Sequence, residues 1–190
     1  MVSVKTGYVI FVYETGKLSS KAIRWATTYK GEDKTKANHV ACVLNTIETV
    51  QAIPPEVARS NVRGYLAHLE SKGGCWCGFR PATPLTLSEE MLCRRYLVGM
   101  IGTKYSHWAN CLALFDSFLT KIRKKDTVCF RKLDHLFSWI NCSGVAGTMA
   151  HKIGRATERM MLADPDMLYD FMVKSEQWEQ YDSSKGWGTI

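Results

Sequence analysis

A cysteine and a histidine, about a hundred residues apart, are the residues of this 190-residue chain best suited to catalysis. Cys142 lies where an apolar run gives way to the small residues Ser143 and Gly144, which predicts the start of an amphipathic helix. A thiol at a helix N-terminus lies at the positive end of the helix dipole, which favours the thiolate. His39 opens an apolar, β-branched run that predicts a buried strand. The pair predicts a thiol hydrolase, in which the imidazole takes the sulfur proton and later protonates the leaving group.

A third polar group has to orient the histidine, and Gln51 is the best candidate. The apolar runs on either side of residues 45–48 predict a hairpin. If the strands pair about this turn, Gln51 and His39 lie side by side, since cross-strand neighbours are about 5 Å apart at Cβ. Gln51 can then accept from one imidazole nitrogen while the other faces Cys142. Glu48 is a competing orienter, but its place in the predicted turn directs it towards water.

Three aromatic or basic side chains in the segment 104–108 are candidates for the wall of the same cleft. They are Tyr105, His107 and Trp108. Tyr105 and Trp108 are also explained as core aromatics, the more common role of such residues. His107 is the next candidate for the base if His39 has a structural role.

The seven cysteines form neither a metal-binding nor a disulfide pattern. Their number is odd, and they are scattered through apolar stretches, which favours reduced thiols. Cys75 and Cys77 have one residue between them, too few for a zinc knuckle, and no second Cys/His pair has finger spacing. We therefore expect no metal and no organic cofactor.

A net charge of +7 suits an anionic partner such as cell-wall polymer, phospholipid or nucleic acid. One dense basic cluster offers an anionic-surface contact, although a solvated loop or helix end is the more common explanation of such a cluster. The cluster consists of Lys121, Arg123, Lys124 and Lys125. No finger spacing, ribonucleoprotein motif or phosphate loop is present, so a specific nucleic-acid partner is not expected.

The length and the 46% hydrophobic content predict one compact domain over residues 1–179, followed by a polar, loose tail over residues 180–190. No window reaches the roughly 18 uninterrupted apolar residues of a membrane span. The N-terminus lacks the basic-then-apolar order of a secretory signal. We expect a cytoplasmic protein, with association to a virion as an alternative.

The apolar patterns mix the periods of strands and helices and predict an α+β fold, with a small, mainly antiparallel sheet packed against helices. Besides the hairpin, strands are expected at 8–13 and 75–80, and helices at 18–26, 86–102, 109–122, 142–153 and from 164 onward. Residues 57–69 stay open between strand, turn and short helix. Residues 133–140 are helical or extended.

Several further segments extend the motif around the two reactive residues. Residues 38–44 read Asn-His-Val-Ala-Cys-Val-Leu, and residues 141–146 read Asn-Cys-Ser-Gly-Val-Ala. The other matching segments are Gly7 to Phe11, Val50 to Ala52, Gly102 to Trp108 and Ala163 to Leu168. In this order they resemble the circularly permuted branch of the NlpC-type papain-like superfamily, which is related to lecithin-retinol acyltransferase and to bacterial proteins of the YiiX and YebB type. In that branch the histidine strand precedes the cysteine helix.

The resemblance implies a permuted papain-like fold and a cysteine hydrolase or acyltransferase that forms a thioester on Cys142, with His39 as base. The implied substrates are peptide bonds of the bacterial cell wall or acyl groups of lipids. Relatives carry a glutamate or histidine at the position of Gln51 and an acid at the position of Gly144. The uncharged Gln51 favours, to a degree, the alternative of a non-catalytic binding or structural module in a phage or bacterial assembly.

Overall fold

The computed structural model describes residues 4–14, 37–105, 119, 141–185 and 187. Several of the predicted features lie outside these residues: the helix at 18–26, the helix at 109–122 except for residue 119, the segment 133–140, His107, Trp108, and the basic cluster of Lys121, Arg123, Lys124 and Lys125.

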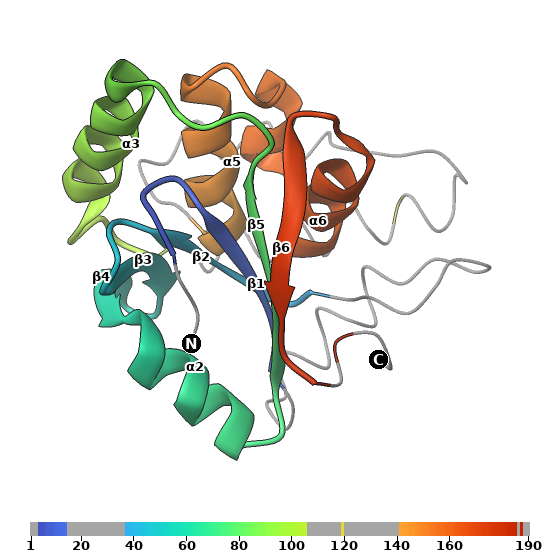
Figure 1. Cartoon of the computed structure of the whole chain (residues 1–190). Helices are drawn as coiled ribbons and strands as arrows, with labels where there is room; N and C mark the ends of the chain where they lie inside the picture. The colour runs from blue at the N-terminus through green and yellow to red at the C-terminus, as the bar shows by residue number, and fades with distance from the viewer. Residues whose placement is uncertain (1–3, 15–36, 106–118, 120–140, 186, 188–190) are drawn as a thin grey trace.

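Within the described residues, a six-stranded sheet forms the centre of the molecule, and each neighbouring pair of strands is antiparallel (Figure 1). Its spatial order is β4 (Glu56–Asn61), β3 (Glu48–Ile53), β2 (His39–Val43), β1 (Val9–Tyr13), β5 (Cys75–Pro81) and β6 (Trp178–Ser183). All five residues of β1 are buried, because helices cover both faces of the sheet. A strand with two buried faces reads as a continuous apolar run, which explains the run from residue 9 to residue 13.

The helices lie in two layers, one on each face of the sheet (Figure 1). One face packs against α3 (Leu87–Met100), α5 (Cys142–Lys152), the 3-10 helix η2 (Glu158–Leu162) and α6 (Pro165–Lys174). The other face packs against α2 (Val62–Ser71). The prediction of an α+β fold with an antiparallel sheet packed on helices is confirmed.

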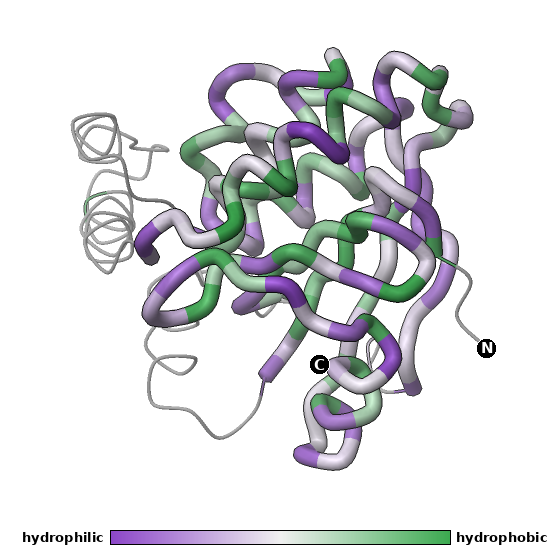
Figure 2. Tube along the Cα trace, turned by 90° about the vertical axis from the view of Figure 1, so that its left-hand side faces the viewer, coloured by the Kyte–Doolittle hydropathy of each residue, from purple (hydrophilic) through white to green (hydrophobic). Residues whose placement is uncertain are grey.

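Successive side chains of β1 point alternately to the two faces of the sheet, each of which has its own hydrophobic core. Val9 and Phe11 belong to the larger core beneath α5 and α6, and Ile10 and Val12 belong to the smaller core beneath α2. Hydrophobic and hydrophilic residues alternate along the outer helices in Figure 2, as expected for helices with one buried face. In the part of the chain that the structure describes, no helix has both the length and the hydrophobicity needed to cross a bilayer.

Capping side chains fix the first residues of α3 and α2. Thr86 and Glu89 form a reciprocal capping box at the start of α3, and Gly102 follows that helix with a φ of +81°. The open segment 57–69 divides into most of β4 and the first part of α2, and Asn61 caps the helix by accepting from the Gly64 N–H.

The prediction of a loose tail from residue 180 is wrong in its first part. Residues 178–183 form β6, which pairs with β5 at the edge of the sheet. Trp178 anchors the strand, because its buried indole N–H donates to the carbonyl of Arg155 at 3.0 Å. The rest of this edge strand is polar and largely exposed, so no apolar alternation marked it.

Candidate active site

Cys142 is the first residue of α5, as predicted. The Asn141 side chain caps this helix by accepting from the Gly144 N–H at 2.7 Å. The cap fixes the first turn, so the sulfur lies at the positive end of the helix dipole. The residue is 7% exposed, which leaves the thiol shielded but at the edge of the core.

The side chains of His39 and Cys142 form a hydrogen bond at the start of β2 and α5. Burial by itself would raise the pKa of the thiol. The charge of His39 and hydrogen bonds from His39 and from the N–H groups of Val40 and Ser143 outweigh burial and lower the pKa of Cys142 below its ordinary value. Burial also opposes protonation of His39, but the Cys142 charge and hydrogen bonds raise the pKa of the imidazole. Each side chain thus favours the charged form of the other.

The other described cysteines have the opposite tendency. Burial raises the pKa of Cys75 to about 11 and the pKa values of Cys77 and Cys93 to about 12. Burial raises the pKa of Cys42 as well. Among the five cysteines in the described ranges, Cys142 alone has a lowered pKa, which is the property of a nucleophilic thiol.

Gln51 provides the third polar group that the sequence predicted. Its Oε1 lies 2.7 Å from Nε2 of His39, so the ring N–H donates to the amide oxygen. This contact leaves Nδ1 as the ring nitrogen available to Cys142. Gln51 is 1% exposed, and its Nε2 donates to Oγ of Ser60 at 2.8 Å. A buried hydrogen-bonded line therefore runs from the sulfur to β4.

The register of the hairpin differs from the one predicted. β2 and β3 pair with Cys42 opposite Val50, and continuing this register places Gln51 opposite Ala41. Gln51 therefore reaches His39 along a diagonal, which a long side chain can span.

Glu48, the competing orienter, has other partners. Its carboxylate accepts from Nδ2 of Asn45 at 2.7 Å and lies 3.7 Å from the Arg59 guanidinium. It therefore stabilises the turn and does not compete with Gln51 for the histidine.

The sulfur has a backbone donor because β2 and β3 separate at this end of the hairpin. The Val43 N–H donates to the carbonyl of Tyr8, which precedes β1. Successive N–H groups along a strand point to opposite sides, so the N–H of Val40, three residues earlier, points towards β3. The paired register there includes Cys42 and Val43 but not residue 40, and the Val40 N–H bonds to the Cys142 sulfur instead. The sequence carried no signal for this donor.

Two further side chains near the histidine were missed in the sequence. Ser60 lies in β4 and accepts from Gln51. The Tyr65 ring lies edge-on to His39, with 6.5 Å between ring centroids, and its buried hydroxyl has no hydrogen-bond partner among the described residues. Both residues fall in the segment whose secondary structure the sequence left open.

Of the three predicted cleft residues, only Tyr105 lies within the described ranges. It is partly buried and packs against the larger core, and its N–H donates to the carbonyl of Pro55 at 2.9 Å. This position is that of a core aromatic, the alternative weighed above.

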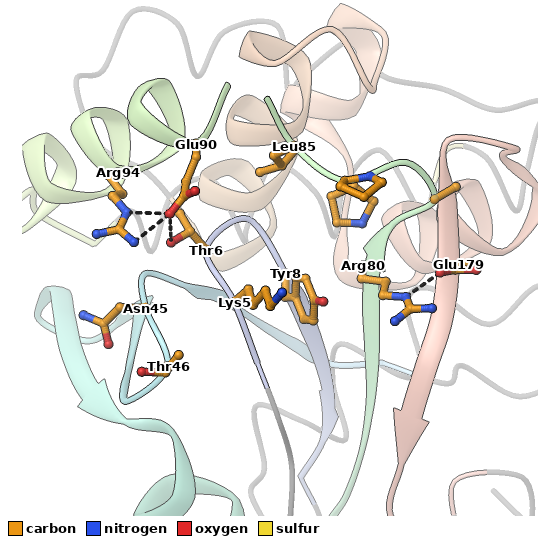
Figure 3. A pocket seen from close by; sticks show the side chains of 13 residues that line it. Lys5, Thr6, Tyr8, Asn45, Thr46, Arg80, Leu85, Glu90, Arg94 and Glu179 are labelled. Atoms are coloured by element: carbon orange, nitrogen blue, oxygen red, sulfur yellow. Dashed lines mark hydrogen bonds and ion pairs between the residues drawn. The ribbon is translucent and has the colours of Figure 1, made fainter. Parts of the chain in front are cut away.

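A pocket of about 620 Å³ lies where β1 begins and β5 ends (Figure 3). This is the opposite end of the sheet from His39, which pairs with Val12. Lys5, Arg80 and Arg94 line it, but the guanidinium of Arg80 pairs with Glu179, and that of Arg94 pairs with Glu90 at 2.7 Å. Neither Cys142, His39 nor Gln51 borders this pocket. It is therefore separate from the thiol site.

No protein-family model matches the chain, and no curated protein matches it. Among solved structures, the chain is similar to the crystal structure of the metalloprotein YiiX from Escherichia coli, with a TM-score of 0.59. The match covers 96% of this chain and 99% of that protein at 14% sequence identity. At this identity the similarity establishes a shared fold and nothing beyond it.

Proposed function

We propose that the protein is a cysteine hydrolase or acyltransferase that cleaves an amide or ester through a thioester on Cys142. The observation that carries the proposal is the hydrogen-bonded line of Cys142, His39 and Gln51 at the N-terminus of α5. A low-pKa thiol, a base and a group that orients the base are the parts of nucleophilic acyl transfer. The proposal also draws on the resemblance to the permuted NlpC-type branch.

The thiolate of Cys142 would attack the carbonyl carbon, forming a C–S bond and moving the carbonyl electron pair onto oxygen. The N–H groups in the first turn of a helix have no acceptor within the helix, and the N–H of Cys142 would donate to this oxyanion. The tetrahedral intermediate collapses with cleavage of the C–N or C–O bond, and Nδ1 of His39 protonates the leaving group. Water or an acceptor alcohol or amine, deprotonated by His39, then releases the acyl group from sulfur.

The substrate classes implied by the resemblance are peptides of the bacterial cell wall and acyl groups of lipids. The net charge of +7 suits the anionic surface of either material. The proposal therefore includes both classes.

Incubation with cell-wall fragments and, separately, with lipid extract tests the proposal by mass spectrometry of the intact protein. We expect an acyl adduct on Cys142, whose mass identifies the substrate class. The adduct should disappear in Cys142→Ala and persist in Cys93→Ala, which removes another buried thiol. If neither material gives an adduct and Cys142 alkylates no faster than Cys93, the chain is a non-catalytic module.

The description of YiiX as a metalloprotein raises the question of a metal at the same place. A thiolate and an imidazole are zinc ligands, but protein zinc sites take at least three such ligands. The described residues contain no group of three His, Cys, Asp or Glu side chains that could hold a metal ion. Gln51 moreover occupies the second ring nitrogen of His39. The described donors do not fit a metal site, and the proposed reaction uses none.

A further inference from the structure

We propose that Ser60 is a positioning residue, which holds the side-chain amide of Gln51 in place and thereby keeps His39 aligned with Cys142. The inference deepens the proposed function and rests on its Cys142–His39 pair. Ser60 itself does not contact the thiol in this arrangement, since Gln51 lies between Ser60 and the imidazole.

The geometry is a diagonal line across three neighbouring strands. Gln51 in β3 pairs opposite Ala58 of β4, and Ser60 is the next residue of β4 on the same face. The small Ala58 leaves room for the long glutamine side chain. Its amide then reaches Ser60 at 2.8 Å on one side and His39 at 2.7 Å on the other.

The hydrogen bond to Ser60 matters because the side-chain amide of Gln51 is buried. Gln51 is 1% exposed, so an amide N–H that loses its protein acceptor is cut off from bulk water. Leaving a buried donor unsatisfied is costly, and the side chain relieves that cost by turning away. Such a turn would move Oε1 away from Nε2 of His39.

The contact matters to the thiol through the charge of the histidine. The hydrogen bond from Gln51 raises the pKa of His39, and the charge of His39 lowers the pKa of Cys142. A misplaced amide therefore lowers the pKa of His39, and the loss of the imidazolium charge raises the pKa of Cys142.

The test compares Ser60→Ala, Ser60→Thr and Thr49→Val in the full chain by the pH profile of Cys142 alkylation with iodoacetamide. Ser60→Ala should slow alkylation at neutral pH about tenfold, as is typical when a group that orients a reactive side chain is lost, and should move the half-maximal rate to higher pH. Ser60→Thr keeps the hydroxyl and should restore the profile. Thr49→Val is the matched control, because the Thr49 hydroxyl bonds to the Ser60 carbonyl and not to Gln51.

A double-mutant cycle identifies the route of the effect. In a Gln51→Ala background, Ser60→Ala should cause no further change in the alkylation profile. The proposal is overturned if Ser60→Ala has the same effect in both backgrounds, or if it shifts only the unfolding midpoint and leaves the profile unchanged.

The alkylation readout needs no natural substrate, so it separates this inference from the proposed function. If the effects of Ser60→Ala and Gln51→Ala on alkylation are coupled but no acyl adduct forms, the role of Ser60 is supported and the proposed reaction is contradicted. An acyl adduct on Cys142 without coupling would support the reaction and overturn the role of Ser60.

Discussion

A Cβ atom added to Gly147 in α5 would lie 1.9 Å from the carbonyl oxygen of Met160 in η2. The two elements thus touch at the level of the backbone, and only glycine fits between them. This close contact requires a glycine at position 147. Because its buried residues are small, α5 lies close to both the sheet and η2. Its first residue, Cys142, then reaches the start of β2.

The contact predicts that Gly147→Ala destabilises the fold, although alanine is the better helix former. The Met160 backbone has to move, and overpacking of this kind costs about 1–3 kcal/mol. Chemical denaturation measures the change. Gly99→Ala is the matched control in α3, where an added Cβ meets nothing within 4 Å, and it should stabilise by about 0.5–1 kcal/mol. Equal effects at both positions would contradict the close packing of α5.

Removal of the imidazole should reverse the pKa shift of the thiol. Without His39, burial prevails and raises the pKa of Cys142 above its ordinary value of about 8.5. The half-maximal alkylation rate should therefore move from below about pH 8.5 in the wild type to above it in His39→Ala. Turnover of an acyl substrate should fall by about 10²–10⁴.

His151→Ala is the control for this prediction, because His151 is an exposed residue at the other end of α5. It should leave the alkylation profile unchanged. A His39→Ala protein that unfolds, or one that retains full turnover, would show that His39 has a structural role.

Gln51→Glu should preserve or increase turnover. A carboxylate keeps the contact with Nε2 and adds a charge that stabilises the imidazolium, so the pKa of His39 rises further. Gln51→Ala should slow turnover without abolishing it, because the imidazole remains but loses its alignment. Rates of both variants on one acyl substrate decide the matter, and Gln51→Ala at the wild-type rate would remove Gln51 from the site.

Tyr65→Phe should stabilise the fold by about 1 kcal/mol, because the variant removes a buried hydroxyl that has no partner among the described residues. The ring, and its edge-on contact with His39, is retained. Urea denaturation measures the gain. A loss of stability would show that the hydroxyl has a partner in the native protein.

Local sequence patterns were enough to predict the elements that carry the chemistry. The apolar runs at 8–13 and 75–80 formed β1 and β5, and Cys142 began a helix because Asn141 can cap it and small residues follow. The apolar runs on either side of residues 45–48 predicted the hairpin that carries His39 and Gln51. These are local signals, which depend on neighbours along the chain.

The contacts among these residues depend on strand pairing, which local sequence does not specify. The register of the hairpin, shifted by two residues from the predicted one, made the His39 contact diagonal, and the separation of β2 from β3 left the Val40 N–H available to the sulfur. Residues 178–183, which are mostly polar apart from Trp178, pair with the otherwise unpaired edge of β5. Strand pairing depends on partners far away in the chain, and a polar edge strand leaves no periodic pattern, so neither could be predicted from local sequence.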